Sequence, residues 1–289
     1  MIIVKIYGGL AGQMMQYAFA NFLELKKKEQ VKLDISFYSE QIHNISFRKF
    51  ELLNLNTGFS IATEDDYTQI FSEIKFSDKI LYKLFRKPVK SNVNFIESKP
   101  FCYDPEVLNQ KYKIYDGYWV NSQYMSFIDS KLKNDFTPRY PIIPENKDLL
   151  NSIESSNSVS IHFRRGDYLV HANHNVMKDD YYYKAIGYIK KHVSNPIFFV
   201  FSDDIEYVRA TYDVLGDAVF IDHNKGEESY WDIFLMSKCK HNIIANSGFS
   251  YWGAWLNTNS NALVVAPSTW MQSENKIAEN LLLPSWYII

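Results

Sequence analysis

The second half of the chain alternates short apolar runs with amphipathic stretches in a regular order. Five runs rich in β-branched and aromatic residues predict buried strands. They span residues 158–163, 195–204, 218–222, 242–247 and 262–267. Four stretches between them carry apolar residues at helical spacing. They span residues 179–193, 205–215, 227–239 and 248–257. Alternating strands and helices predict a doubly wound α/β fold with a parallel sheet.

The first half of the chain begins with the same pattern. An apolar run at 2–6, a helical pattern at 13–28 and a second apolar run at 31–36 form a βαβ unit, which also implies a parallel sheet. The pattern is weak over 38–110, and residues 88–105 read as irregular. We expect residues 38–110 to shape the ligand-binding pocket of the first half and so to determine which ligand it accepts.

A group of three prolines interrupts the pattern near the middle of the chain, at Pro138, Pro141 and Pro144. We place the domain linker there. The prediction is an N-terminal Rossmann-like domain over 1–144 and a C-terminal one over 145–289. The last helix is free in this prediction to pack back on the N-terminal domain.

Composition narrows the class of protein. The 289 residues are 46% hydrophobic and carry a formal net charge of −2, so a sizeable core is expected and nucleic acid is not an expected partner. The apolar N-terminal run lacks the pattern of a signal peptide, so a cytoplasmic protein is expected. Lysines at 26–28 are expected to form a solvated helix end. The basic stretch 83–90 leaves peripheral contact with the inner face of a membrane open.

The first candidate site is the glycine-rich turn GGLAGQMMQYA at 8–18, which follows the first predicted strand. It differs from the dinucleotide fingerprint G-x-G-x-x-G, and a lone glycine-rich turn is a weak signal. Gly9, Gly12 and Gln13 belong either to a tight turn with close helix–strand packing or to a backbone cradle for a ligand.

The second candidate site is HFRRGD at 162–167, which ends a predicted strand. Alternation along a strand sends His162 and Arg164 to one side and Arg165 to the other. One arginine can then face a crevice while the other pairs with Asp167 or a neighbouring acid. Arginine suits a diphosphate because its planar fork donates paired hydrogen bonds and keeps its charge. A purely structural arginine–aspartate pair is the alternative.

The third candidate site is ANSGFSYWGAWL at 245–256, where a strand end meets a helix start. Its backbone N–H groups and hydroxyls can bind phosphate oxygens. The candidate residues are Asn246, Ser247, Gly248, Phe249 and Ser250. Asp232, on the preceding predicted helix, has a carboxylate that can accept hydrogen bonds from the N1–H and N2–H₂ groups of guanine.

No metal is expected. The sequence contains neither H-E-x-x-H nor D-x-D, and its two cysteines, Cys102 and Cys239, are far apart. His171 and His174 have a spacing that could bind metal on a helix, but their asparagine-rich surroundings favour a loop.

Together these motifs resemble the bacterial α-1,2-fucosyltransferases of glycosyltransferase family 11. GGLAGQMMQYA, SIHFRRGDYL and ANSGFSYWGAWLN are similar to three family motifs in the same order, and DGYWVNSQY (116–124) and FSDDIEYV (201–208) match family blocks in kind. The resemblance implies a GT-B-like architecture, in which two Rossmann-like domains face a cleft. It also implies a metal-independent, inverting transfer of L-fucose from GDP-β-L-fucose to O2 of a galactoside in an oligosaccharide or lipid-linked glycan.

The resemblance also implies roles for single residues. His162 and Arg164 would contact the diphosphate, Asp232 would hold guanine, and 247–250 would hold the β-phosphate. Asp167 is the first candidate for the catalytic base, with a structural pairing role as its alternative. The chain departs from the family at Ala11-Gly12, where the family has Gly-Asn. The polar function of the missing asparagine would fall to Gln13 or to water. Another GDP-sugar transferase and a non-catalytic GDP- or carbohydrate-binding protein are the rival interpretations.

Overall fold

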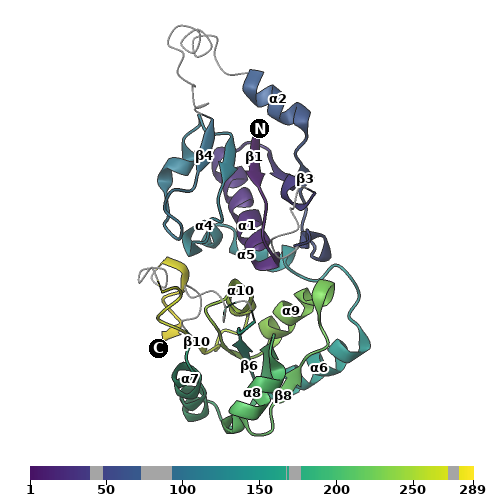
Figure 1. The fold of residues 1–289 in the computed structure, drawn as a ribbon, viewed down its shortest axis with the longest axis vertical. Coiled ribbons are helices and arrows are strands. Elements are labelled where there is room, and N and C mark those ends of the chain that lie inside the picture. The colour runs from purple at the N-terminus through teal and green to yellow at the C-terminus, as the bar shows by residue number, and fades with distance from the viewer. Residues whose placement is uncertain (40–47, 73–92, 167, 169–176, 273–279) are drawn as a thin grey trace. The chain divides into compact units, whose positions relative to one another are not determined.

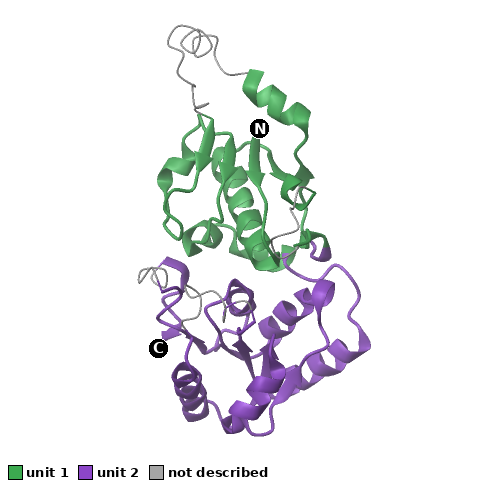
Figure 2. Cartoon of the chain, viewed as in Figure 1, with its two compact units in different colours: residues 1–53, 57–135 green, residues 54–56, 136–289 purple. Residues whose placement is uncertain are grey.

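The structure is a computed structural model that describes residues 1–39, 48–72, 93–166, 168, 177–272 and 280–289. It contains two compact units (Figures 1 and 2). Unit 1 comprises Met1–Leu53 and Thr57–Asp135, and unit 2 comprises Asn54–Asn56 and Phe136–Ile289. The division between Asp135 and Phe136 therefore lies ahead of the linker predicted from the prolines.

The segment after Asp135 belongs to unit 2 because its side chains and backbone are bound there. The Phe136 ring packs edge-on against Trp252, with centroids 5.0 Å apart. The backbone N–H of Asn56 donates to the Thr137 carbonyl at 2.9 Å, so residues 54–56 pair with this segment.

Unit 1 is built on a five-stranded sheet in the order β3-β2-β1-β5-β4, with all pairings parallel. Its strands are β1 (Ile2–Lys5), β2 (Val31–Asp34), β3 (Ser60–Ile61), β4 (Asn94–Ile96) and β5 (Ile114–Asp116). Its helices are α1 (Leu10–Lys27), α2 (Glu64–Ser72), α4 (Ser122–Ser126) and α5 (Asp129–Asp135). Strand β4 lies in the stretch that was expected to be irregular.

Helix α1 is buried along most of its length because it carries apolar or uncharged side chains on nearly every face. The ring of Phe19 stacks on Trp119 with centroids 4.0 Å apart, which anchors the helix against the segment that follows β5. The helix ends at Lys27, and the capping residue Lys28 adopts a left-handed conformation with φ 54° and donates its N–H to the Glu24 carbonyl.

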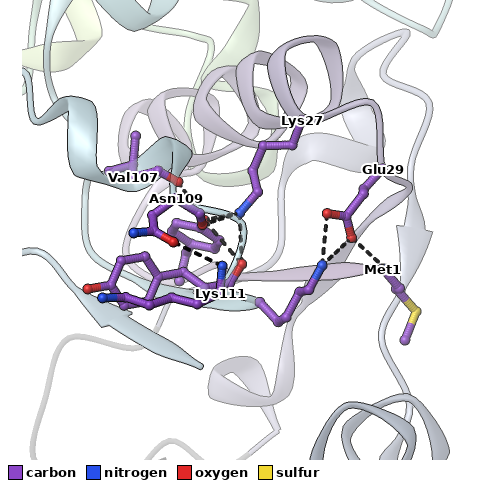
Figure 3. A network of polar contacts seen from close by, with 9 residues as sticks. Met1, Lys27, Glu29, Val107, Asn109 and Lys111 are labelled. Atoms are coloured by element: carbon purple, nitrogen blue, oxygen red, sulfur yellow. Dashed lines mark hydrogen bonds and ion pairs between the residues drawn. The ribbon is translucent and has the colours of Figure 1, made fainter. Parts of the chain in front are cut away.

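One lysine of the expected solvated helix end is in fact buried (Figure 3). Lys27 Nζ donates to the carbonyls of Asn109 and Tyr112 at 2.9 and 2.8 Å, and to the Tyr115 hydroxyl at 2.8 Å. Burial lowers the pKa of Lys27 to about 8. The prediction of a fully solvated patch was therefore wrong at Lys27, because three oxygens distant in sequence surround its ammonium group.

Unit 2 contains a six-stranded parallel sheet in the order β11-β10-β9-β6-β7-β8. Its strands are β6 (Asn157–Phe163), β7 (Pro196–Ser202), β8 (Val219–Ile221), β9 (His241–Ile243), β10 (Val264–Ala266) and β11 (Tyr287–Ile288). Its helices are α6 (Pro144–Ser155), α7 (Asp179–His192), α8 (Ile205–Thr211), α9 (Tyr230–Lys238) and α10 (Gly248–Trp255). The five predicted strands are confirmed, and the final residues form a sixth strand in the sheet of unit 2.

The strand order of unit 2 is that of a doubly wound dinucleotide-binding fold. Counted from β6, the strands lie in the order 3-2-1-4-5-6 across the sheet. The order reverses between β6 and β9, and ligands of such sheets bind beyond the carboxyl ends of the strands at this switch point. The prediction of two Rossmann-like α/β units is confirmed, while a cleft between them stays a prediction.

Candidate functional site at the switch point of unit 2

Strand β6 separates an apolar face from a polar one. Its alternate residues Val159, Ile161 and Phe163 belong to the core that α7 and α8 cover. The intervening residue Ser160 points to the other face, where its hydroxyl accepts a hydrogen bond from Asn242 at 2.7 Å. This alternation delivers the side chain of the next residue on the polar face to the carboxyl edge of the sheet.

That next residue is His162, and its side chain is buried against the start of α10. It is 5% exposed, and its ring lies 5.8 Å from that of Phe249 between centroids. Burial, followed by the charge of Arg164, lowers the pKa of His162 to about 3. Among the described residues, its Nδ1 is a buried atom without a hydrogen-bond partner. The imidazole is therefore neutral and suited to hydrogen bonding rather than to supplying a positive charge.

Both arginines of the HFRRGD motif bind acids at the end of β7. Arg164 Nη1 lies 2.8 Å from Asp203 Oδ2, and Arg165 Nε lies 3.0 Å from Asp204 Oδ2. The Arg165 guanidinium also lies over the Tyr207 ring, 3.2 Å from its centroid. Arg165 pairs with a neighbouring acid, as expected for one of the two arginines. Arg164 also pairs with an acid, which the sequence did not predict for both arginines at once.

Arg164 is held by this ion pair and stays partly exposed. Its side chain is 28% exposed, and its guanidinium carries five N–H donors. Asp203 also accepts the backbone N–H of Arg165 at 2.9 Å, so its carboxylate is held at two points. The pair can therefore orient the guanidinium at the carboxyl edge of the sheet.

The first turn of α10 completes this edge. Ser247 caps the helix, with its hydroxyl accepting from the Phe249 N–H at 3.3 Å. The Ser250 hydroxyl accepts from the Ala245 N–H at 3.1 Å and is buried. Ser250 therefore stabilises the turn, and phosphate binding there would rest on the backbone N–H groups of the first turn of α10.

Asn246 and Gly248 flank the capping residue with different surroundings. Asn246 is 1% exposed, and its Nδ2 donates to the Trp270 carbonyl at 2.9 Å. Its amide thus anchors the loop to the segment after β10. Gly248 is half-buried and begins the helix.

Asp232 lies in the first turn of α9, which follows the end of β8 on the same edge of the sheet. Its Oδ1 accepts a hydrogen bond from Asn224 Nδ2 at 2.8 Å. Burial raises the pKa of Asp232 to about 7, and the Asn224 bond acts in the opposite direction. A carboxyl group in this environment gains by meeting further hydrogen-bond donors.

In unit 1 the glycine-rich turn is held by Gln13, which is fully buried. Gln13 Nε2 donates to the carbonyls of Gly8 and Lys49 at 3.1 and 2.7 Å, and its Oε1 accepts from the Glu51 N–H at 2.8 Å. Gly8 has φ +81°, a conformation that favours glycine. Gln13 therefore binds the backbone of its own unit, as a tight structural turn requires.

The other two glycines of this turn lie beside long side chains. A Cβ added at Gly9 would lie 3.6 Å from an Arg48 nitrogen, and one added at Gly12 would lie 3.5 Å from the Tyr118 ring. Both distances are ordinary contacts. The turn is thus compact at Gly9 and Gly12, and neither position forbids a small side chain.

We expect Gln13→Ala to lower the free energy of unfolding by about 2 kcal/mol, because three partly buried hydrogen bonds to the backbone are lost. Chemical denaturation of the variant and the wild type measures this change. In GDP titrations, the affinity of the variant's folded fraction should stay within about threefold of wild type, since Gln13 is committed to the turn. An unchanged stability with a lost ligand affinity would instead show that Gln13 reaches a ligand.

Sequence patterns missed three polar residues that hold these elements. Gln16 accepts the Tyr7 N–H at 3.0 Å and donates to the Gly117 carbonyl at 3.2 Å, which ties α1 to the ends of β1 and β5. Asn146 and Asn224 form the second case and are described below. The position of Gln16, about one helical turn after Gln13, could have indicated that it lies on the same face of the helix. No sequence feature could have indicated that Asn146 and Asn224 pair.

Some predicted positions lie outside the described residues, namely Asp167, His171, His174 and the basic stretch 83–90. Within the described ranges, no group of three or more His, Cys, Asp or Glu side chains is arranged to hold a metal ion. None of the helices described is long and apolar enough to cross a membrane.

Comparison with known proteins identifies the chain as a glycosyltransferase. It belongs to glycosyl transferase family 11, whose sequence profile matches residues 1–289.

Its relatives include two Escherichia coli proteins that match along nearly their whole length. The O-antigen biosynthesis glycosyltransferase WbnK is 35% identical, over 96% of this chain and 97% of that protein. An alpha-1,2-colitosyltransferase is 31% identical, over 94% and 93% of the two chains. The galactoside alpha-(1,2)-fucosyltransferase 2 of Gorilla gorilla gorilla is 27% identical, over 61% and 55%. A solved structure of Arabidopsis thaliana FUT1 with GDP has a TM-score of 0.49 at 12% identity, over 91% and 69%.

Proposed function

We propose that this glycosyltransferase transfers L-fucose from GDP-β-L-fucose to O2 of a β-galactoside in a surface glycan, with inversion and without a metal ion. The observation that carries the proposal is that Arg164, the neutral His162 and the first turn of α10 all lie at the carboxyl edge of the unit 2 sheet, with His162 packed beside Phe249. The names of the relatives support the choice of sugar and glycan, since they refer to O-antigen biosynthesis and to α-(1,2)-fucosyl transfer.

In the proposed reaction, the bond from the fucose anomeric carbon to the diphosphate breaks as the acceptor O2 attacks from the opposite face. Negative charge grows on the departing GDP, while the sugar gains oxocarbenium character. The Arg164 guanidinium, held by Asp203, and the N–H groups at the start of α10 would stabilise that charge. His162 would donate or accept one hydrogen bond at the diphosphate while remaining neutral.

The acceptor hydroxyl must lose its proton, and Asp167 remains our candidate base. The alternative role left open for Asp167 was that of an arginine partner. Arg164 and Arg165 pair with Asp203 and Asp204, while Asp167 itself lies outside the described residues, so both roles of Asp167 stay predictions. A pH–rate profile of Asp167→Asn tests the assignment, because a base that acts in the transition state sets the acidic limb of the profile.

For the nucleobase, we propose that Asp232 accepts the N1–H and N2–H₂ donors of guanine. Each carboxylate oxygen has two lone pairs, so Oδ1 can keep the Asn224 bond and still accept from the base. Uracil and adenine do not present this pair of adjacent donors. The proposal therefore predicts selectivity for GDP over UDP and ADP.

GDP binding should strengthen as pH rises through the raised pKa of Asp232, which is about 7. Only the ionised carboxylate accepts both guanine donors, so protonation competes with the base. We expect the dissociation constant of GDP to be about tenfold higher near pH 6 than near pH 8. The terminal phosphate of GDP also titrates, and Asp232→Asn reports that contribution alone. Calorimetry on the wild type and on Asp232→Asn separates the pH dependence due to Asp232 from that due to the phosphate. Parallel pH profiles for the two proteins would contradict the role of Asp232 in binding guanine.

Colitose is the second candidate sugar, because a relative that matches nearly the whole chain is named an alpha-1,2-colitosyltransferase. Colitose lacks the 3-hydroxyl that fucose carries, so the two GDP-sugars differ at one polar group. Turnover of GDP-fucose, GDP-colitose and GDP-mannose with one β-galactoside acceptor ranks these donors. Preference for GDP-colitose would replace fucose in the proposal and leave the nucleotide site unchanged.

The experiment that tests the proposed function is calorimetric titration of GDP in EDTA, with UDP and ADP as controls. Selective GDP binding, followed by fucosyl transfer with inversion in the same buffer, is the expected result. Binding or transfer that requires a divalent ion would overturn the metal-independent mechanism. GDP binding without transfer from any GDP-sugar would favour a non-catalytic binding protein.

A further inference from the structure

The loop after β8 contains an asparagine whose side-chain oxygen and nitrogen are both hydrogen-bonded. Asn224 is 6% exposed. Its Nδ2 donates to Asp232 Oδ1 at 2.8 Å and to Asn146 Oδ1 at 3.0 Å, and its Oδ1 accepts from Asn146 Nδ2 at 2.9 Å. Every hydrogen-bonding atom of this amide therefore has a partner, and one of those partners is the proposed guanine-binding carboxyl.

The reciprocal pair of amides fixes which end of Asn224 faces Asp232. If both amides were turned over, the Asn224 oxygen would meet a carboxylate oxygen and repel it. Asn146 is fully buried in the first turn of α6 and also contacts His223 Nε2 at 2.9 Å. Because α6 packs against both α9 and β6, this anchor belongs to the core of unit 2.

Asp232 depends on this arrangement for its direction. Among the described residues, Asn224 is the only side chain that hydrogen-bonds to its carboxyl. A carboxyl in a largely buried position without that bond would turn toward whatever donor remains, or take up a proton. Two acceptor oxygens aligned with two adjacent donors require a fixed plane, which Asn224 supplies.

We infer that Asn224, held by Asn146, is a positioning residue that sets the plane of the Asp232 carboxyl for a guanine base. This inference rests on the proposed function. It adds that base selectivity depends on two asparagines that need not touch the ligand. It also predicts that their loss weakens recognition of the guanine 2-amino group more than it weakens binding of the diphosphate.

The test compares GDP with inosine diphosphate, which lacks only the 2-amino group. The wild type should bind GDP about tenfold or more tightly than inosine diphosphate, as expected for one hydrogen bond to a charged group. In Asn224→Ala this ratio should fall toward that of Asp232→Asn. In Asn146→Ala, which keeps the direct bond, we expect a smaller fall of about threefold. Calorimetry gives affinity and competent fraction together, so partial unfolding does not distort the ratio.

Asn257→Ala is the matched control. Asn257 Nδ2 donates to the Cys239 carbonyl at 2.8 Å and to Asn242 Oδ1 at 2.7 Å, near the start of β9 and away from the carboxyl edge. This variant should lose stability and keep the wild-type ratio. A wild type without preference for GDP would contradict the proposed role of Asp232. A wild-type preference that survives in both Asn224→Ala and Asn146→Ala would overturn the inference alone.

Discussion

Replacing Arg164 with alanine should lower kcat/KM for fucosyl transfer by about 10² to 10³-fold. The guanidinium is a fixed positive charge at the edge where the proposed diphosphate departs, and its partner Asp203 holds it from one side at 2.8 Å. Neutral His162 cannot replace that charge. The loss should appear mainly in kcat, because negative charge on the diphosphate is greatest in the transition state.

Arg165→Ala is the control, since it removes the same side chain one position along. Arg165 binds Asp204 and lies over the Tyr207 ring, both on the α8 side of the motif. Its loss should lower stability by about 1 kcal/mol and leave kcat within a few-fold of wild type. Arg164→Lys should recover only part of the rate, because an ammonium group lacks the fork that binds two oxygens together. Full turnover by Arg164→Ala would remove Arg164 from the mechanism.

The same glycine-to-alanine change should have opposite effects in two helices of unit 2. A Cβ added at Gly253 in α10 would lie 2.7 Å from the Met236 Cβ in α9. Such an approach forces the two helices apart, and we expect a loss of about 2 to 3 kcal/mol in unfolding free energy. At Gly187 in α7, an added Cβ meets nothing within 4 Å. Alanine there should stabilise the protein by about 0.5 to 1 kcal/mol, because it is the better helix former.

Denaturant unfolding of the two variants measures this difference of about 3 kcal/mol. GDP affinity provides a second reading, because α9 carries Asp232 and α10 begins at Gly248. The folded fraction of Gly253→Ala should bind GDP more weakly, while Gly187→Ala should bind it as the wild type does. Equal stabilities for the two variants would show that the close approach at Gly253 relaxes without cost.

How much the sequence predicted depended on the length and regularity of each element. Helix α7 and strands β6 and β7 are long enough for periodicity to define them, and they lie where expected. Strands β4 and β11 have three and two residues and lie outside the predicted apolar runs, whereas β8, β9 and β10, with three residues each, overlap longer ones. Strands β4 and β11 exist because β5 and β10 offer edges to pair with, which is a tertiary property.

The candidate site divides in the same way. The carboxyl ends of β6 and β9 could be located from local pattern alone, because strand ends in a parallel sheet share one edge. The hydrogen-bond partners of individual side chains could not be predicted from local pattern. Ser250 is expected to bind phosphate, and the structure adds that its hydroxyl accepts a hydrogen bond from the Ala245 N–H five residues earlier. The Asn146–Asn224 pair joins positions 78 residues apart, beyond the reach of any local rule.

Residues 54–56 interrupt unit 1 in sequence and belong to unit 2. Leu55 bridges to Pro138, and Asn54 Nδ2 donates to the Glu227 carbonyl at 3.3 Å in the loop before α9. A chimaera made by joining one family member's N-terminal half to another's C-terminal half at residue 136 would thus supply this tripeptide from the wrong parent. Exchanges that aim to transplant donor specificity should carry residues 54–56 together with 136–289, so that the graft has two segments instead of one.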